Sequence, residues 1–218
     1  MASDQELVQA TACAIIDKLN SGDVTPLDLL DVLEKRIAEV DGQVNALPTL
    51  CFDRARTRAR ALMKRPAGDR GLLAGLPVPI KDLTDVEGVL TTQGSPIYRD
   101  NIPTRSDLVV EGLEGNGALV YAKSNTPEFG AGANTFNEVF GATRNAFDAT
   151  KSAGGSSGGA AVALATRMLP VADGSDTMGS LRNPAGWNNI FALRPSAGRG
   201  GVCRTPPEMS KLQCGGIT

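Results

Sequence analysis

The sequence predicts an α/β fold behind a helical N-terminal section. Three observations lead to this class. Apolar residues recur at helical spacing through the first 65 residues, whereas short apolar segments with strand composition alternate with helical segments after residue 66. Hydrophobic residues make up 41% and charged residues 21% of the 218 residues, which suits a globular protein with a sizeable core. Strands that alternate with helices favour a layered α/β architecture.

Capping signals define the first two predicted helices. Ser3 and Glu6 form a capping-box pattern, and apolar residues at helical spacing follow as far as Ile15, so we expect one helix there. A Thr-Pro pair at residues 25 and 26 opens the second helix, with a hydroxyl at the cap and proline at the first helical position. Gly42 is the expected stop of that helix.

A third helix is predicted from Phe52 to Met63. It carries four arginines, which could form a phosphate-binding strip. At helical spacing, however, the arginines spread around the cylinder while the apolar residues share one side, so we expect a solvated helix face. The arginines are Arg54, Arg56, Arg58 and Arg60, and the inward residues are Ala55, Ala59 and Leu62.

The remainder of the chain alternates in the way an α/β core requires. Two helices are expected, at residues 107–114 and 160–168. The expected extended segments or strands are residues 76–80, 119–122, 170–172 and 191–193.

Composition excludes several classes of function. The net charge is −2 and aromatic residues are 4%, so neither phosphate backbones nor stacked bases have an evident binding surface, and no nucleic-acid partner is expected. No apolar run reaches the length that spans a membrane, and no signal peptide is visible, so we expect a cytoplasmic protein.

Cysteine and histidine usage argues against a metal site. The chain has no histidine, the commonest zinc ligand and general base. The spacing of Cys13, Cys51, Cys203 and Cys214 resembles neither a metal site nor a disulfide framework, which indicates reduced thiols. We expect no metal and no cofactor.

The stretch from Lys151 to Pro184 is where we expect chemistry, because two glycine- and serine-rich turns flank its helical segment. Residues 154–159 match the start of a phosphate-binding loop, but two alanines replace the required Lys-Ser/Thr. Residues 130–135 begin a dinucleotide fingerprint and then reach Thr135 where the last glycine belongs. Nucleotide binding is therefore not expected.

A third pattern concerns serine catalysis. Residues 155–159 satisfy G-x-S-x-G, which would make Ser157 a nucleophile dependent on a histidine that this chain lacks. A lysine held neutral by burial is the chemical alternative. Lys81 ends a rigid apolar segment and is the best such residue, although spacing alone favours a surface lysine.

Several separated segments, in order along the chain, resemble the amidase signature family. That family consists of amide hydrolases and related amidotransferases with a central mixed β-sheet between helical layers. The resemblance implies one domain over residues 1–218, with a helical section (1–65) and an α/β catalytic core (66–218) that ends early, because family members are much longer. The segments that carry it are Pro79–Asp82, Lys123–Phe129, Gly141–Asn145, Gly154–Gly159 and Asp176–Arg182.

Carried over residue by residue, the resemblance implies a Ser-Ser-Lys relay. Ser180 would be the nucleophile that forms the acyl-enzyme. Ser156, which follows a cis peptide bond in the family, would pass protons between Ser180 and Lys81. Lys81 would begin neutral and act as the base.

The resemblance also implies a supporting loop. The backbone N–H groups of Thr177, Met178, Gly179 and Ser180 would form the oxyanion hole. Ser157, Asp176 and Arg182 would support the site without reacting. Many relatives have glycine where Met178 stands, so we expect a narrower acyl pocket.

The residues themselves leave other interpretations open. Ser180 could cap a short helix, and Ser156 and Ser157 could be ordinary turn serines. The leading hypothesis is hydrolysis of a small-molecule amide to an acid and ammonia or an amine, with a homodimer left open. The alternatives are a glutamyl-tRNA amidotransferase A-type subunit, or an inactive truncated homologue.

Overall fold

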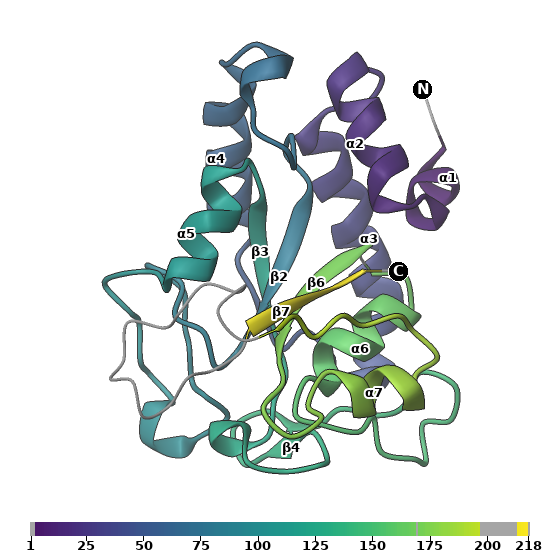
Figure 1. Cartoon of the computed structure of the whole chain (residues 1–218), viewed down its shortest axis with the longest axis vertical. Coiled ribbons are helices and arrows are strands. Elements are labelled where there is room, and N and C mark those ends of the chain that lie inside the picture. Colours follow the sequence, from purple (N-terminus) through teal and green to yellow (C-terminus); the bar gives the residue numbers. More distant parts are fainter. Residues whose placement is uncertain (1–2, 169, 197–212, 218) are drawn as a thin grey trace.

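The computed structural model describes residues 3–168, 170–196 and 213–217, and it has a mixed α/β architecture (Figure 1). Strands β2, β3 and β6 lie at the centre, with α1–α3 on one side and α4 and α5 on the other in that view. The helices are α1 (Asp4–Gln9), α2 (Ala12–Ser21), α3 (Pro26–Val44), α4 (Phe52–Met63), α5 (Leu108–Gly115), α6 (Gly158–Ala165) and α7 (Arg182–Trp187), with 3-10 turns η1 (Ala67–Asp69), η2 (Pro96–Tyr98) and η3 (Glu128–Gly130). The strands are β1 (Thr49–Leu50), β2 (Pro77–Lys81), β3 (Leu119–Ser124), β4 (Phe136–Asn137), β5 (Gly141–Ala142), β6 (Val171–Ser175) and β7 (Gln213–Ile217).

The N-terminal section differs from prediction at two boundaries. The capping box of Ser3 and Glu6 is present, but the expected single helix is divided into α1 and α2. The division arises because Thr11 takes an extended conformation and its side chain accepts the N–H of Ala14, which starts a second helix. Gly42 does not end α3; the helix continues to Val44, and Asn45 closes it with a left-handed φ of 54°.

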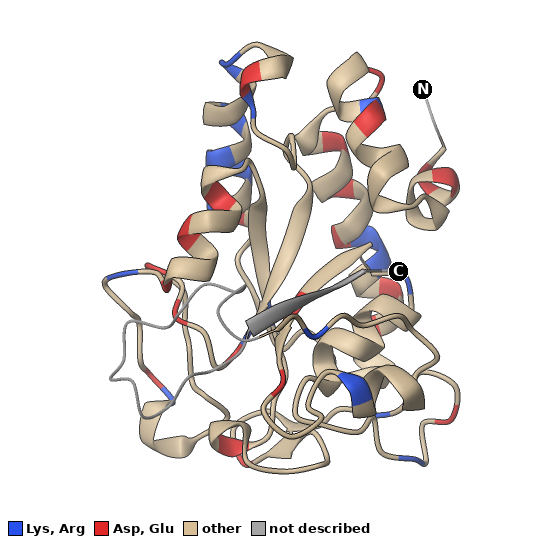
Figure 2. Ribbon diagram, in the orientation of Figure 1, with Lys and Arg blue, Asp and Glu red and all other residues tan. Residues whose placement is uncertain are grey.

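Helix α4 has the predicted bounds and the predicted buried face. Three of its four arginines, Arg54, Arg56 and Arg58, form ion pairs in addition to facing solvent. Arg54 pairs with Glu114 of α5 at 2.6 Å, and Arg56 pairs with Asp31 and Glu34 of α3 at 2.8 and 2.6 Å. Figure 2 shows basic residues of α4 beside acidic residues of α5. Ion pairs thus fasten α4 to both neighbouring helices.

The central sheet has the order β1-β3-β2. Strand β3 pairs antiparallel with β1 and parallel with β2, and every residue of β2 and β3 is buried. Strand β6 lies alongside β2 and pairs antiparallel with β7. Helix α6 is wholly apolar in its side chains and packs against β2, β3 and β6. The carboxyl ends of β2 and β6 therefore lie close to the start of α6.

One predicted strand is wrong. Residues 191–193 form no strand within the described part of the chain, and the side chains of Phe191 and Leu193 are exposed. The apolar triplet after Ile190 fits the strand pattern, but no strand among the described residues pairs with it.

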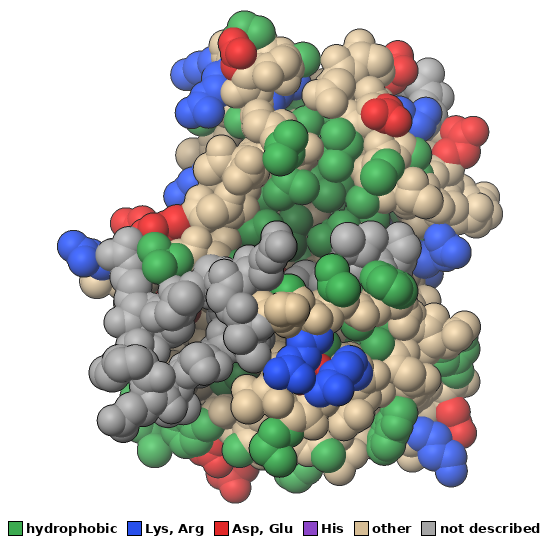
Figure 3. All heavy atoms as spheres, viewed as in Figure 1, with side chains coloured by type: hydrophobic (Ala, Val, Ile, Leu, Met, Phe, Trp, Pro, Cys, Tyr) green, Lys and Arg blue, Asp and Glu red, His purple; other side chains and the backbone are tan. Residues whose placement is uncertain are grey.

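Figure 3 shows other hydrophobic side chains gathered over β2 and β3, between the two groups of helices. In the described residues, no helix has both the length and the apolar character needed to cross a bilayer.

Candidate active site

Lys81 stands at the carboxyl end of β2 and is fully buried. Its Nζ forms hydrogen bonds with three serine hydroxyls, at 2.7 Å to Ser156, 2.9 Å to Ser157 and 3.0 Å to Ser175. The interpretation of Lys81 as an ordinary surface lysine is therefore wrong. A hydroxyl can donate and accept, so these three partners suit a lysine side chain in either protonation state.

The glycine-serine turn brings Ser156 and Ser157 beneath Lys81. The Gly155–Ser156 peptide bond is cis, as the resemblance implied, and both serines are buried. The Ser157 hydroxyl also donates to the carbonyl of Ser175 and accepts its N–H, at 3.3 and 3.2 Å. Gly174 permits this approach, because a Cβ there would lie 3.0 Å from the Ser157 oxygen. Ser157 thus joins the turn to β6.

The loop after β6 is organised around Asp176. Its buried carboxylate accepts the N–H groups of Gly179, Leu181 and Arg182 and two guanidinium N–H groups of Arg182. Burial alone would raise the pKa of Asp176, but the Arg182 guanidinium and the loop N–H groups outweigh it and hold that pKa well below its usual range. Asp176 and Arg182 therefore brace the loop that carries Ser180.

Ser180 lies on this loop, and its carbonyl accepts the N–H of Ser157 at 3.1 Å. It does not cap α7, because the residue at the cap position is Leu181, which makes no side-chain capping bond. Within the described residues, the Ser180 hydroxyl forms no hydrogen bond, and neither do the N–H groups of Thr177, Met178 and Ser180. The N–H of Gly179, by contrast, is already bonded to Asp176.

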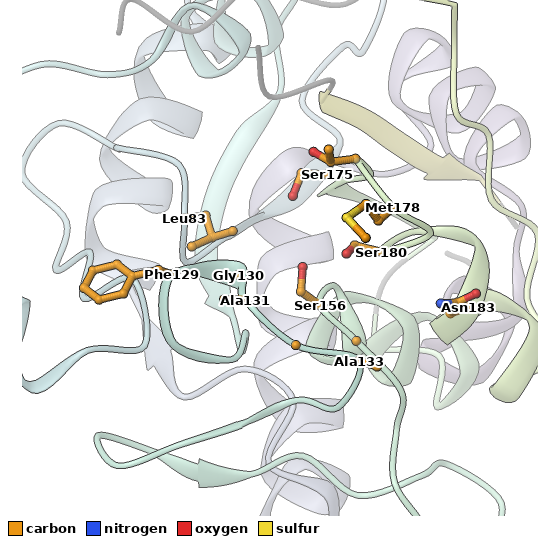
Figure 4. A pocket seen from close by; sticks show the side chains of 13 residues that line it. Leu83, Phe129, Gly130, Ala131, Ala133, Ser156, Ser175, Met178, Ser180 and Asn183 are labelled. Atoms are coloured by element: carbon orange, nitrogen blue, oxygen red, sulfur yellow. The ribbon is translucent and has the colours of Figure 1, made fainter. Parts of the chain in front are cut away.

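A cavity of about 400 Å³ joins these parts. Figure 4 shows the side chains of Ser156, Ser175 and Ser180 around it, with Met178 next to Ser180 and with Leu83 and Phe129 across from them. Met178 is 89% exposed. The described lining contains no charged side chain; it also includes Gly130, Ala131, Gly132, Ala133, Gly155, Thr177 and Asn183. Ser156 and Ser180 therefore border the same cavity.

A second buried lysine lies close by. Lys123 on β3 donates to the carbonyl of Thr84 at 2.6 Å and to the Thr91 hydroxyl at 2.8 Å, and it pairs with Asp82 at 3.6 Å. Burial lowers the pKa of Lys123, and the charge of Asp82 opposes that shift. Neither lysine lines the cavity, but Lys81 hydrogen-bonds to Ser156 and Ser175, which do, whereas the hydrogen-bond partners of Lys123 lie outside the lining.

Sequence reasoning missed Ser175 and Asp173, both on β6. Ser175 bonds the Lys81 amine, and the Asp173 carboxylate accepts the backbone N–H of Lys81. The two residues are separated by Gly174, and residues two apart on a strand point to the same face. This spacing is the signal that could have placed both side chains on the face toward Lys81.

The described residues contain no group of three or more acidic, histidine or cysteine side chains that could hold a metal ion. Cys13 and Cys51 are free thiols, whereas Cys203 and the side chain of Cys214 lie outside the described residues.

A family model described as Amidase matches residues 28–218. The chain belongs to the amidase family. Its amidase relatives include the A-type subunit of the glutamyl-tRNA(Gln) amidotransferase of Roseiflexus sp. (strain RS-1), which is 39% identical over 88% of this chain and 40% of the relative. The AtzE subunit of the 1-carboxybiuret hydrolase of Pseudomonas sp. (strain ADP) is 40% identical over 85% of this chain and 41% of the relative.

Solved amidase structures agree in fold. A bacterial aryl acylamidase of the amidase signature family superposes with a TM-score of 0.89 at 30% identity, over 95% of this chain and 44% of that one. The 6-aminohexanoate cyclic dimer hydrolase gives a TM-score of 0.81 at 31% identity, over 88% and 39%. The mixed α/β fold is thus confirmed, and the chain spans about 40% of the length of the curated relatives it matches.

Proposed function

We propose that the protein hydrolyses a small-molecule carboxylic amide through a serine acyl-enzyme. The observation that carries this proposal is the contact between Lys81 Nζ and Ser156 Oγ at 2.7 Å, with Ser156 and Ser180 lining one cavity. In this proposal Lys81 is the base, Ser180 is the nucleophile, and Ser156 passes protons between them.

The proposed reaction begins with neutral Lys81. Lys81 takes the proton of Ser156, Ser156 takes the proton of Ser180, and the Ser180 oxygen attacks the amide carbonyl. Ser156 next gives a proton to the leaving nitrogen and regains one from the Lys81 ammonium, so the C–N bond breaks to give the acyl-enzyme, an amine or ammonia, and neutral Lys81. Water deacylates Ser180 by the same relay run a second time.

The oxyanion hole is proposed at the loop after β6. The N–H groups of Thr177, Met178 and Ser180 supply it, since none of them is bonded within the described residues. Gly179, the fourth residue implied by the resemblance, donates to Asp176 and so contributes by shaping the loop, with a φ of 110° that favours glycine. Met178 borders the acyl group. Ser157 fixes Lys81 and β6 without reacting.

The test is amide hydrolysis by the wild-type protein and by Ser180→Ala, with Ser21→Ala on α2 as the matched control. Ammonia or amine release and the mass of a trapped acyl-enzyme are measured with simple aliphatic and aromatic amides. We expect release and acylation in the wild type and in Ser21→Ala, and neither in Ser180→Ala. Undiminished acylation of Ser180→Ala would refute the assignment of the nucleophile.

The A-type subunit of a glutamyl-tRNA amidotransferase is the second candidate, because relatives with that function in their names are 38–41% identical to this chain. That function would require partner subunits and glutamyl-tRNA, so glutaminase activity appearing only when both are added would identify it. Absence of turnover and of acylation under either condition would identify an inactive homologue. A cytoplasmic location and a homodimer stay predictions; size-exclusion chromatography with light scattering tests the latter.

A further inference from the structure

We propose that Asp173 is a positioning residue for Lys81. The Asp173 carboxylate holds the Lys81 backbone in place, and its charge influences whether the Lys81 amine carries a proton. This inference rests on the proposed function, since it concerns the same base. Asp173 lies on β6, is buried, and does not line the cavity. It therefore acts on the reaction only through Lys81.

The backbone of Lys81 lies between β3 and β6, which flank β2 on its two sides. On one side β2 pairs with β3, where Lys81 lies opposite Ser124 and the N–H of Asp82 reaches the Ser124 carbonyl. Toward β6, the backbone N–H of Lys81 is taken by a side-chain oxygen, Oδ1 of Asp173. The carboxylate thus holds the last residue of β2 at the position from which its Nζ reaches the three serines.

The charges around Asp173 influence whether its carboxyl group is ionised. Against the larger effect of burial, the hydrogen bond from the Lys81 backbone N–H and the charges of Lys123 and Lys81 favour its ionised form, and Asp107, before α5, opposes it. Helix α6 brings no titratable side chain, and that of Cys214 on β7 lies outside the described residues. The other carboxyl oxygen, Oδ2, is buried and accepts no hydrogen bond within the described part. Burial, the largest effect, raises the pKa of Asp173 to about 6.

The interaction between the two groups is mutual. Lys81 favours a charged Asp173, so a charged Asp173 favours the ammonium form of Lys81. The relay needs the neutral amine. Protonation of Asp173 as the pH falls through about 6 removes a charge that holds the proton on Lys81, so the two groups lose protons as a coupled pair.

Two variants separate position from charge. Asp173→Asn keeps an oxygen for the Lys81 N–H and removes the charge, whereas Asp173→Ala removes both. We expect the acid limb of the pH dependence of acylation to move about one unit lower in Asp173→Asn, with the plateau rate within about threefold of wild type. Asp173→Ala should lower the plateau at least tenfold. Asp148→Asn, a change on an exposed loop, should leave the profile unchanged.

A readout that needs no turnover accompanies the kinetics. In protein labelled with ¹³C at the aspartate carboxyls, a signal that titrates near pH 6 should be absent from Asp173→Asn and should titrate at higher pH in Lys81→Met. An unmoved acid limb in folded Asp173→Asn, or an unmoved Asp173 titration in folded Lys81→Met, would overturn the inference. If no amide is hydrolysed while the Asp173 titration moves as expected, the coupling stands and the proposed function fails.

Discussion

The raised pKa of the buried Asp173 carboxyl group leads to a prediction about protein stability that does not depend on catalysis. Its pKa of about 6 in the folded protein exceeds the ordinary value of 3.8, because burial disfavours the charged form. Between these two pH values the folded protein binds more protons than the unfolded chain, so the free energy of unfolding falls as the pH rises. The full penalty is present above pH 6 and absent below pH 3.8.

The magnitude follows from the width of that window. An interval from 3.8 to about 6 is worth about 3 kcal/mol, since each pH unit corresponds to about 1.4 kcal/mol. Asp173→Asn has no titrating group there and escapes the penalty. We therefore expect the unfolding free energy of Asp173→Asn, relative to wild type, to increase by about 3 kcal/mol between pH 4 and pH 7.

The assay is urea unfolding of wild type and Asp173→Asn at several values between pH 4 and pH 7.5. The difference between the two proteins removes the contribution of groups that titrate alike in both. Asp148→Asn provides a control of opposite sign, because hydrogen bonds from Thr150 lower the pKa of Asp148 and their stabilisation is lost as the pH falls. A wild-type–Asp173→Asn difference that stays constant across the range would refute a raised pKa at Asp173.

Three further predictions concern the site and its support. Lys81→Ala should abolish acylation while the circular dichroism spectrum remains native; normal burst kinetics in this variant would exclude the relay. Gly159→Ala should lower the unfolding free energy by about 1–3 kcal/mol in urea titrations, because its Cβ would lie 2.3 Å from the backbone nitrogen of Asn125. Arg182→Ala should lower the thermal unfolding midpoint at pH 7, because the Asp176 carboxylate loses two guanidinium donors; an unchanged midpoint would contradict the bracing role.

Local patterns predicted the elements whose signals are local. The bounds of α4 match because its apolar spacing and its flanking residues agree, and β3 was expected from an apolar run that the structure buries completely. The apolar triplet at residues 191–193 failed because a strand needs a neighbour, and an apolar run does not reveal one. Gly42 was misread for another reason: a glycine can end a helix, but it is also tolerated inside one, as it is in α3.

The polar half of β6 could not be predicted from composition. The expected strand ended at residue 172, because Asp173, Gly174 and Ser175 have the composition of a turn. In the structure the strand continues through them, and the polar side chains of Asp173 and Ser175 find their partners on Lys81. A strand that enters a polar site loses its apolar signal at the residues that form the site, so only the alternation of the polar side chains remains as a local signal.

The hydrogen-bond partners of Lys81 favour a lysine that changes its protonation state. Two nearby carboxylates pair with other side chains, Asp82 with Lys123 and Thr92 and Asp176 with Arg182, and Asp173 binds the backbone N–H of Lys81. The Nζ of Lys81 instead meets serine hydroxyls, which accept from an ammonium and donate to a neutral amine. A carboxylate partner could only accept, and it would stabilise the ammonium alone. Because the hydroxyls can reorient when the proton leaves, Lys81 can be buried in this setting without being fixed in one charge state.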